Sequence, residues 1–356
     1  MSENYRRPAL RLALMGLGRA MFDSHFPVFE AHPALFNVVA ACDLEKPRRD
    51  RVAKSFPKCR MFRQFGDMLD ERDIDLVLIA LPNKDRTQYI LKSIQRGFWT
   101  LIESPFGVDL DEANVLRGAA LKSRSRLAVV NRSVFEPDFM LARQVIDSGR
   151  LGKLRKIEIR RNDYIRRDDW QAVRRQGGGA TQCIFQDMIL QALRLLPGQP
   201  AQMWSDLKRI ASLGDSEDYA HLALVNRDLQ TADVEYNGGF VSDETLPSFR
   251  ILGDTGTLSV MPGAREGKIT VIDPGFKPPR RRTSIRTPSL KDLHEEIPML
   301  SETVSLDKFT QTGKAAFWHA IYSAVRTAVP LPFTLEESME AVKIAQLMRR
   351  SSPFGR

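Results

Sequence analysis

The chain has 356 residues, 43% hydrophobic and 27% charged, which is enough for two globular domains, and no apolar stretch approaches the about eighteen residues of a membrane span. Its net charge of +9 would suit nucleic acid, but the basic residues are spread along the chain without a recognisable binding motif, so we expect neither nucleic acid nor membrane as a partner. The charge favours a basic site for an acidic or phosphorylated small molecule over nucleic acid, and it favours a merely solvated surface still more. Three cysteines, an odd number without metal-ligand spacing, favour a reducing cytoplasm over a disulfide scaffold.

The first predicted element is a strand over residues 11–15 that ends in a glycine turn at Gly16 and Gly18. A helical segment and a second strand at 38–42 follow, and Asp43 closes that strand. The first glycine allows a tight turn, the second lets the backbone approach a pyrophosphate, and the helix start beyond them attracts negative charge. Asp43 follows at a spacing near the roughly 20 residues expected for an acid that binds ribose hydroxyls. The segment therefore predicts a dinucleotide site.

Met21 stands where a third glycine normally allows close packing of helix on strand, so we expect a wider crossing or a Met21 side chain that bends away. Asp43 favours NAD as the cofactor, because a carboxylate would repel the 2′-phosphate of NADP. Arg48 and Arg49 leave NADP as the less favoured alternative, although both also suit a solvated helix face. The expected cofactor contacts from this part of the chain are Gly16, Gly18, Arg19, Ala20, Met21 and Asp43.

Strands and helices then alternate up to about residue 127. Residues 74–81 form a near-continuous apolar run, which is typical of a parallel strand buried on both faces. Such alternation predicts an α/β, doubly wound Rossmann domain over residues 1–127. The predicted helices lie near 46–55, 64–70, 85–96 and 111–123, and the extended segments at 59–62, 74–81, 99–103 and 127–130.

Residues 128–356 follow a different pattern, in which successive strands with turns between them suggest a largely antiparallel sheet and hence an α+β domain. Residues 274–310, rich in proline, charge and serine, are predicted to be a long loop or arm. Two closing helices are expected to pack back on the first domain. The predicted strands lie at 156–160, 203–213, 220–225, 231–236, 249–252 and 257–260, and the helices at 137–149, 182–196, 313–328 and 334–350.

A series of short motifs runs from about residue 9 to 352: Gly16-Leu-Gly18 with His25, Leu81-Pro82-Asn83, Glu103-Ser104-Pro105, Gly149-Arg-Leu-Gly152, Asp169-Trp170-Gln171, Gly177-Gly178-Gly179, Gly253-Asp-Thr-Gly256-Thr-Leu and Pro332-Phe-Thr-Leu-Glu336-Glu337-Ser. The order of these motifs resembles the glucose-fructose oxidoreductase / inositol dehydrogenase (Gfo/Idh/MocA) family. The resemblance implies a Rossmann domain, an open-faced sheet domain, and a small-molecule substrate held at the nicotinamide between them. It also implies homodimers or tetramers built through the sheet face, and hydride transfer at a hydroxyl-bearing carbon of a sugar or cyclitol.

Four positions depart from the family pattern. Ser104 replaces the lysine of Glu-Lys-Pro, and Arg86 replaces a histidine often found after Pro-Asn. After the triple glycine, Cys183 and Asp187 stand where the family has an acid or asparagine and then a histidine. The family's catalytic assignments therefore do not transfer unchanged. Further cofactor contacts that the resemblance implies are Leu81, Pro82, Asn83, Arg86, Glu103 and Pro105.

Asp187 is the first candidate for the catalytic base, provided that burial raises its pKa from about 3.9 and that it shares a helix face toward the cleft with Cys183. The alternative is an ion pair with Arg132, Arg166 or Arg167, which would lower that pKa and make Asp187 structural. Tyr164 is the reserve proton donor. The Ser104 hydroxyl cannot act as an unassisted base, and the favoured interpretation of Ser104 is a small residue before proline. Expected substrate contacts are Ser104, Arg132, Arg166, Trp170 and Cys183.

Three functions remain open at this point. The first is an NAD-dependent oxidoreductase of sugar-like or acidic polyols in which Asp187 or Tyr164 replaces the missing base. The second is a catalytically inactive relative that binds NAD as a sensor or partner subunit. The third is a lyase or glycosidase that uses NAD transiently. General acid-base groups supply roughly 10² to 10⁴ in rate, so an uncompensated loss of the lysine would leave turnover feeble.

Overall fold

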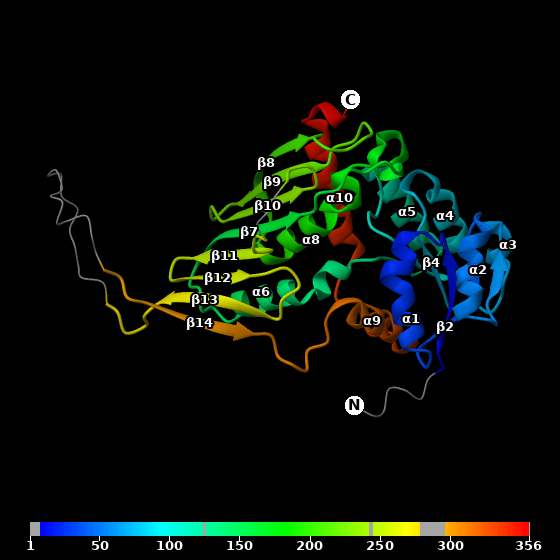
Figure 1. Cartoon of the computed structure of the whole chain (residues 1–356), viewed down its shortest axis with the longest axis horizontal. Helices are drawn as coiled ribbons and strands as arrows, with labels where there is room; N and C mark the ends of the chain where they lie inside the picture. The colour runs from blue at the N-terminus through cyan, green and yellow to red at the C-terminus, as the bar shows by residue number, and fades with distance from the viewer. Residues whose placement is uncertain (1–7, 124–125, 242–244, 278–295, 356) are drawn as a thin grey trace.

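The computed structural model describes residues 8–123, 126–241, 245–277 and 296–355 (Figure 1). Its first sheet is wholly parallel, with the strand order β3-β2-β1-β4-β5-β6. This is the doubly wound order, and a ligand is expected outside the carboxyl ends of its strands, where β1 and β4 diverge. The strands are β1 (Leu10–Met15), β2 (Phe36–Cys42), β3 (Arg60–Phe62), β4 (Leu76–Ile79), β5 (Trp99–Ile102) and β6 (Leu127–Val129).

The strand β1 shows why this sheet needs helices on both faces. Leu12 and Leu14 belong to one buried cluster, whereas Ala13 and Met15 belong to another, because successive side chains of a strand point to opposite faces. The predicted Rossmann fold is therefore confirmed. The helices of this part are α1 (Phe26–Ala31), which continues a π-helical turn η2 (Met21–His25), α2 (Lys46–Ser55), α3 (Phe65–Leu69), η3 (Asn83–Asp85), α4 (Thr87–Gln95) and α5 (Leu110–Ser123).

The second sheet has eight strands in the order β14-β13-β12-β11-β7-β10-β9-β8 (Figure 1). Only β7 and β10 pair in parallel, so the predicted, largely antiparallel sheet is confirmed. In β10, Ala232 and Val234 are buried against the helical side, and Asp233 and Glu235 point to the other face. The strands are β7 (Leu154–Asn162), β8 (Pro200–Lys208), β9 (Tyr219–Asn226), β10 (Thr231–Asn237), β11 (Phe249–Gly253), β12 (Gly256–Val260), β13 (Glu266–Ile272) and β14 (Met299–Ser305).

Three parts of the fold differ from the sequence-based expectation. The strand β13 was not predicted, and residues 299–305, expected in the loop or arm, form β14 at the edge of the sheet; residues 278–295 of that segment lie outside the described part. Nearly every residue of β14 is exposed, so its sequence lacks the apolar alternation that marks a strand. The predicted helix 182–196 is also two helices, α7 (Ala180–Cys183) and α8 (Phe185–Leu195).

The remaining helices connect the two sheets. The helix α6 packs against β11, β12 and β13, and α8 packs against β7 and β10. The helix α10 contacts both α8 of the second half and α5 of the first (Figure 1). None of the helices in the described residues is long and apolar enough to cross a membrane. The elements not yet bounded are η4 (Arg132–Phe135), α6 (Pro137–Asp147), η5 (Trp170–Ala172), η6 (Arg174–Gln176), α9 (Gly313–Thr327), α10 (Leu335–Arg350) and η8 (Pro353–Gly355).

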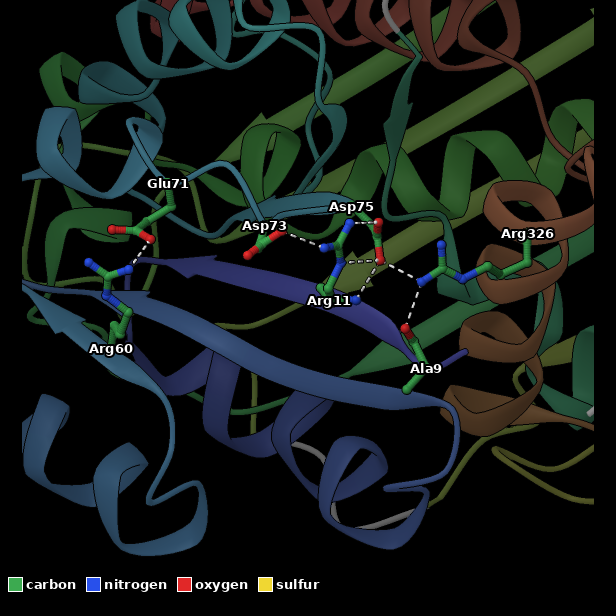
Figure 2. Close-up of polar contacts among 7 residues, drawn as sticks. All are labelled: Ala9, Arg11, Arg60, Glu71, Asp73, Asp75 and Arg326. Carbon is green, nitrogen blue, oxygen red and sulfur yellow. Dashed lines mark hydrogen bonds and ion pairs between the residues drawn. The ribbon is translucent and has the colours of Figure 1, made fainter. Parts of the chain in front are cut away.

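One carboxylate joins α9 to the first sheet (Figure 2). Asp75 accepts hydrogen bonds from the backbone and guanidinium of Arg11 on β1 and from the guanidinium of Arg326 on α9. Arg326 also donates to the carbonyl oxygen of Ala9, at 2.6 Å. Burial would raise the pKa of Asp75, but these hydrogen bonds outweigh it and hold that pKa below its usual value. These contacts hold α9 against the N-terminal end of β1.

Candidate active site at the junction of the two sheets

The glycine turn after β1 fits a dinucleotide. Gly16 has φ +87°, and a Cβ there would lie 2.6 Å from the carbonyl oxygen of Ala80, so no larger residue fits. A Cβ on Gly18 would meet nothing within 4 Å. The first glycine is thus required by the turn itself, whereas the second faces open space in which a diphosphate could approach the backbone.

The helix after this turn begins differently from an ordinary α-helix. Met21, at the position of the missing third glycine, is fully buried, and its carbonyl oxygen accepts the backbone N–H of Phe26 in a π-helical turn. A π-turn is wider than an α-turn, so the helix accommodates Met21 within its packing. Arg19 and Ala20 are exposed at the start of this helix, where a bound diphosphate would lie.

Asp43 is held rigidly at the carboxyl end of β2. Its Oδ2 accepts the N–H of Leu17 at 2.7 Å and its Oδ1 accepts the N–H of Glu45 at 2.9 Å, so the carboxylate links β2 to the glycine turn. Two arginines left open by the sequence also reach it. Arg48 lies 3.5 Å from Oδ2, and Arg49 donates to the main-chain oxygen of Asp43 at 2.6 Å. The acid expected at the ribose is therefore flanked by the cations that would suit a 2′-phosphate.

Glu103, at the end of β5, is fixed by a buried histidine. His25 Nδ1 accepts the indole N–H of Trp318 at 3.2 Å, and because an indole only donates, the neutral ring carries its proton on Nε2. That proton points at Glu103 Oε1, 2.5 Å away. Burial lowers the pKa of His25 and keeps the ring neutral. Burial also opposes ionisation of Glu103, but the hydrogen bond from His25 outweighs it, so the pKa of Glu103 stays below its usual value.

This arrangement predicts the effect of Trp318→Phe. Without the indole donor, His25 Nδ1 can bind a proton, so we expect the pKa of His25 to rise. Titration of the histidine ring signals by NMR measures this. The control is Phe36→Leu, which removes another ring against Trp318 but no hydrogen bond, and which should leave the pKa of His25 unchanged. Equal shifts in both variants would show that packing, and not the indole donor, sets the ring's charge.

Arg86 and Asn83 join neighbouring loops. Arg86 is fully buried, and its guanidinium donates to the main-chain oxygens of Glu103 and Pro105, the former at 2.7 Å. It therefore anchors the segment that carries Ser104. Asn83 is also buried and donates to the carbonyl oxygen of Gly177 at 2.8 Å, which ties the edge of the first sheet to the triple-glycine loop. The expected cofactor contacts Leu81 and Pro82 lie partly exposed before Asn83.

A cleft of about 610 Å³ opens between η4, α8 and β7, and Asp187 lies in its wall. Burial raises the pKa of Asp187 to about 6, although nearby Arg132 and a hydrogen bond with Ser104 act in the opposite direction. No ion pair holds Asp187 among the residues that the structure describes. Of the two sequence-based interpretations, this environment favours a proton acceptor over a structural ion pair.

The expectation that Cys183 and Asp187 share one helix face is wrong. The helix is interrupted at Ile184, whose φ of −137° is not helical, so Cys183 ends α7 and Asp187 belongs to α8. Cys183 lines a separate cavity of about 20 Å³ beside Glu217, and burial raises the pKa of its thiol to about 12. Cys183 is therefore a protonated thiol that does not line the large cleft.

The other predicted site residues are dispersed. Tyr164 and Arg166 are exposed on the segment after β7, and Trp170 is partly buried at the start of η5. None of the three lines the 610 Å³ cleft, whereas Arg132 does. Sequence reasoning did not name six other ionisable residues of this cleft as site residues, because the elements that carry them are far apart in the chain and share no local motif. They are Glu136, Asp138, Arg160, Arg161, Asp163 and Lys314.

A doubly wound parallel sheet with a glycine turn after β1 and an acid at the end of β2 is the arrangement of a dinucleotide-binding domain. Residues 10–131 match the oxidoreductase family with an NAD-binding Rossmann fold, and residues 139–259 match the GFO/IDH/MocA C-terminal domain. The chain belongs to the Gfo/Idh/MocA family of NAD(P)-dependent oxidoreductases.

Two relatives show the range of similarity. A Schizosaccharomyces pombe protein described as an uncharacterized oxidoreductase is 28% identical over 224 residues, which cover 61% of this chain and 60% of that protein. The scyllo-inositol 2-dehydrogenase (NADP(+)) IolW of Bacillus subtilis is 23% identical over 334 residues, 90% of this chain and 89% of its own. The chain thus spans only about three fifths of the first of these relatives.

Solved structures share the whole fold. The protein yvaA from Bacillus subtilis superposes with a TM-score of 0.80 at 18% identity, covering 99% of both chains. The WlbA dehydrogenase from Bordetella pertussis, in complex with NADH and UDP-GlcNAcA, gives a TM-score of 0.76 at 17% identity, covering 98% of this chain and 97% of that one. At these identities the likeness establishes the fold alone.

Proposed function

We propose that this oxidoreductase uses NAD to transfer a hydride at a hydroxyl-bearing carbon of a sugar-like or polyol substrate, with Asp187 as the base. The observation that carries the proposal is the position of Asp187. Asp187 lies in the wall of the 610 Å³ cleft and is hydrogen-bonded to Ser104, the residue that replaces the family's lysine. The pKa of Asp187 is about 6. A carboxyl group with that pKa can accept a proton near neutral pH and release it again. The inositol dehydrogenase among the relatives supports a polyol as the substrate class.

The chain's own groups divide the work. Bound nicotinamide would supply the hydride acceptor or donor. In the oxidative direction, Asp187 takes the proton of the substrate hydroxyl, either directly or through the Ser104 hydroxyl that hydrogen-bonds to it. Arg132 lies near enough to favour the ionised carboxylate before the transfer. Glu103, oriented by His25, is placed at the carboxyl end of β5 to accept hydrogen bonds from the cofactor.

We further propose that NAD is preferred over NADP, with Asp43 at the ribose. The test is the affinity for both coenzymes, measured by calorimetry on the native chain and on Arg48→Ser. We expect NAD to bind at least tenfold more tightly, and Arg48→Ser to leave its affinity within about twofold, because the carboxylate repels a 2′-phosphate. Tighter binding of NADP that Arg48→Ser abolishes would instead assign Arg48 to the 2′-phosphate.

The replacement of the lysine by Ser104 supports a second candidate, a cofactor-binding protein without turnover. Incubation with NAD and a panel of polyols separates the possibilities. Net formation of NADH supports the oxidoreductase, and tight NAD binding without any reaction supports a sensor or partner subunit. A product formed without net NADH would indicate a lyase or glycosidase that uses NAD transiently.

The remaining sequence-based expectations are part of the proposal. We propose a dinucleotide domain over residues 1–127, a substrate and assembly domain over 128–356, and a homodimer or tetramer through the face of the second sheet. Light scattering after gel filtration measures the assembly. A cytoplasmic location agrees with the free thiols of Cys42, Cys59 and Cys183.

A further inference from the structure

Two cations of the 610 Å³ cleft form no ion pair with the described residues, although one of them, Arg132, acts electrostatically on Asp187 and Glu103. Arg132, at the start of η4, makes no hydrogen bond or ion pair with the other described residues, although its guanidinium has five N–H donors. Lys314, on the first turn of α9, donates only to the main-chain oxygen of Asp23, at 2.7 Å. Both cations act electrostatically on Glu136 and on His25, so their charged ends lie at the same end of the cleft.

The other two arginines of the cleft are already paired. Arg161 lies 2.7 Å from Asp163, and Arg160 pairs with Glu235 and Asp233 of the neighbouring strand. Each of these two arginines is therefore paired with a carboxylate of the second sheet. Among the described residues, Arg132 and Lys314 are the cations of the cleft that lack such a pair.

Some acidic side chains of the cleft are likewise hydrogen-bonded within the protein, and others form no ion pair with the described residues. Asp138 is buried and accepts hydrogen bonds from Ser248 and from the N–H of Gly263. Glu136 and Asp187 have no ion-pair partner in the described parts of the chain, and burial raises the pKa of both. In the part of the chain that the structure describes, the cleft thus combines two cations and two carboxyl groups that form no ion pair. Carboxyl groups suit the hydroxyls of a polyol, whereas an unpaired guanidinium suits a carboxylate, which it can bind through two parallel hydrogen bonds.

We propose that the substrate is a hydroxy acid, a polyol whose carboxylate binds to Arg132 and Lys314 while its hydroxyls face Asp187 and Glu136. This rests on the proposed function, and it adds an anionic group as the requirement for recognition. A neutral polyol that displaced water from the cleft would leave the guanidinium of Arg132 without a hydrogen-bond partner, which is costly.

The experiment compares matched pairs of ligands that differ only by a carboxylate. D-Glucuronate and D-glucose, and D-galacturonate and D-galactose, are titrated by calorimetry into the chain saturated with NADH. At least one acid should bind roughly ten- to a hundredfold more tightly than its neutral partner. Arg132→Met and Lys314→Met should each remove most of that difference. Lys268→Met, which removes the same charge from β13 outside the cleft, is the control and should keep it.

The possible outcomes are distinct. If no acid binds more tightly than its neutral partner, or if both cleft variants retain the preference, the proposal is wrong. Lys314 is exposed, so Lys314→Met should fold and keeps the test decisive if Arg132→Met does not. A separate assay of NADH formation with the same ligands tests the proposed function. Acids that bind through Arg132 without turnover would support the carboxylate site and reject the dehydrogenase, whereas turnover of neutral sugars alone would do the reverse.

Discussion

Asp187→Asn should lower turnover by roughly 10² to 10⁴-fold, the usual contribution of a general base, while NAD affinity stays unchanged. The amide has nearly the shape of the carboxylate and can still bond to Ser104, but it cannot accept the substrate's proton. The rate of NADH formation measures turnover, and calorimetry measures NAD affinity. The control is Asp163→Asn, which removes a carboxylate from the same cleft that is already paired with Arg161 and should cost less than tenfold.

The pH dependence checks the same assignment. In the native chain, oxidation should rise with pH through about 6, because Asp187 must lose its proton before it can act as the base. Asp187→Asn should lack this step. If turnover survives in Asp187→Asn with the step intact, Tyr164 is the next group to replace, by phenylalanine.

The stability of Asp187→Asn tests the raised pKa of Asp187 independently of turnover. A folded-state pKa above the unfolded value means that ionisation of Asp187 opposes folding, so the native chain loses stability as pH rises from about 4 through about 6. The variant should therefore be more stable than the native chain at pH 7, by at most about 3 kcal/mol, and equal to it at pH 4. Urea denaturation at the two pH values measures the difference.

Gly16→Val should destabilise the chain by roughly 2 to 6 kcal/mol and abolish NAD binding. A valine would have to adopt φ +87°, and its Cβ would lie 2.6 Å from the carbonyl oxygen of Ala80. Both penalties act at the turn that joins β1 to the first helix. Urea denaturation measures the stability, and calorimetry measures the affinity for NAD.

Gly18→Ala is the matched control, because it adds a Cβ to the same turn where nothing lies within 4 Å. Its stability should stay within about 1 kcal/mol of the native value. Its affinity for NAD should nevertheless fall, because the added methyl occupies the space through which the diphosphate approaches the backbone. Unchanged affinity in Gly18→Ala would place the diphosphate elsewhere.

The cofactor half of the site could be predicted because its geometry is local. A strand, two glycines and a helix are consecutive in the chain, and Gly16 is required by the turn that this order produces. The acid at the end of the next strand follows, because the carboxyl ends of parallel strands meet at one edge. The apolar run at 74–81 likewise identified β4, which is buried on both faces.

The catalytic half could not be predicted to the same depth. Asp187 was named from its position after the triple glycine, but its separation from Cys183 depends on a helix break at Ile184 that no glycine or proline marks. The edge strand β14 could not be predicted, because its exposed side chains show no apolar alternation. The sequence by itself determined the order of elements and the residues of the glycine turn, since neighbouring residues set both.

Only the tertiary structure decided which charges face one another. Trp318 contacts His25 although they lie 293 positions apart in the sequence. Arg132 on η4 and Lys314 on α9 likewise belong to elements that are far apart in the chain. Whether a carboxyl group is a base or half of an ion pair depends on its burial and on its neighbours' charges. Both are properties of the packed chain, so the pKa of Asp187 and the free cations beside it could be known only once the two halves were brought together.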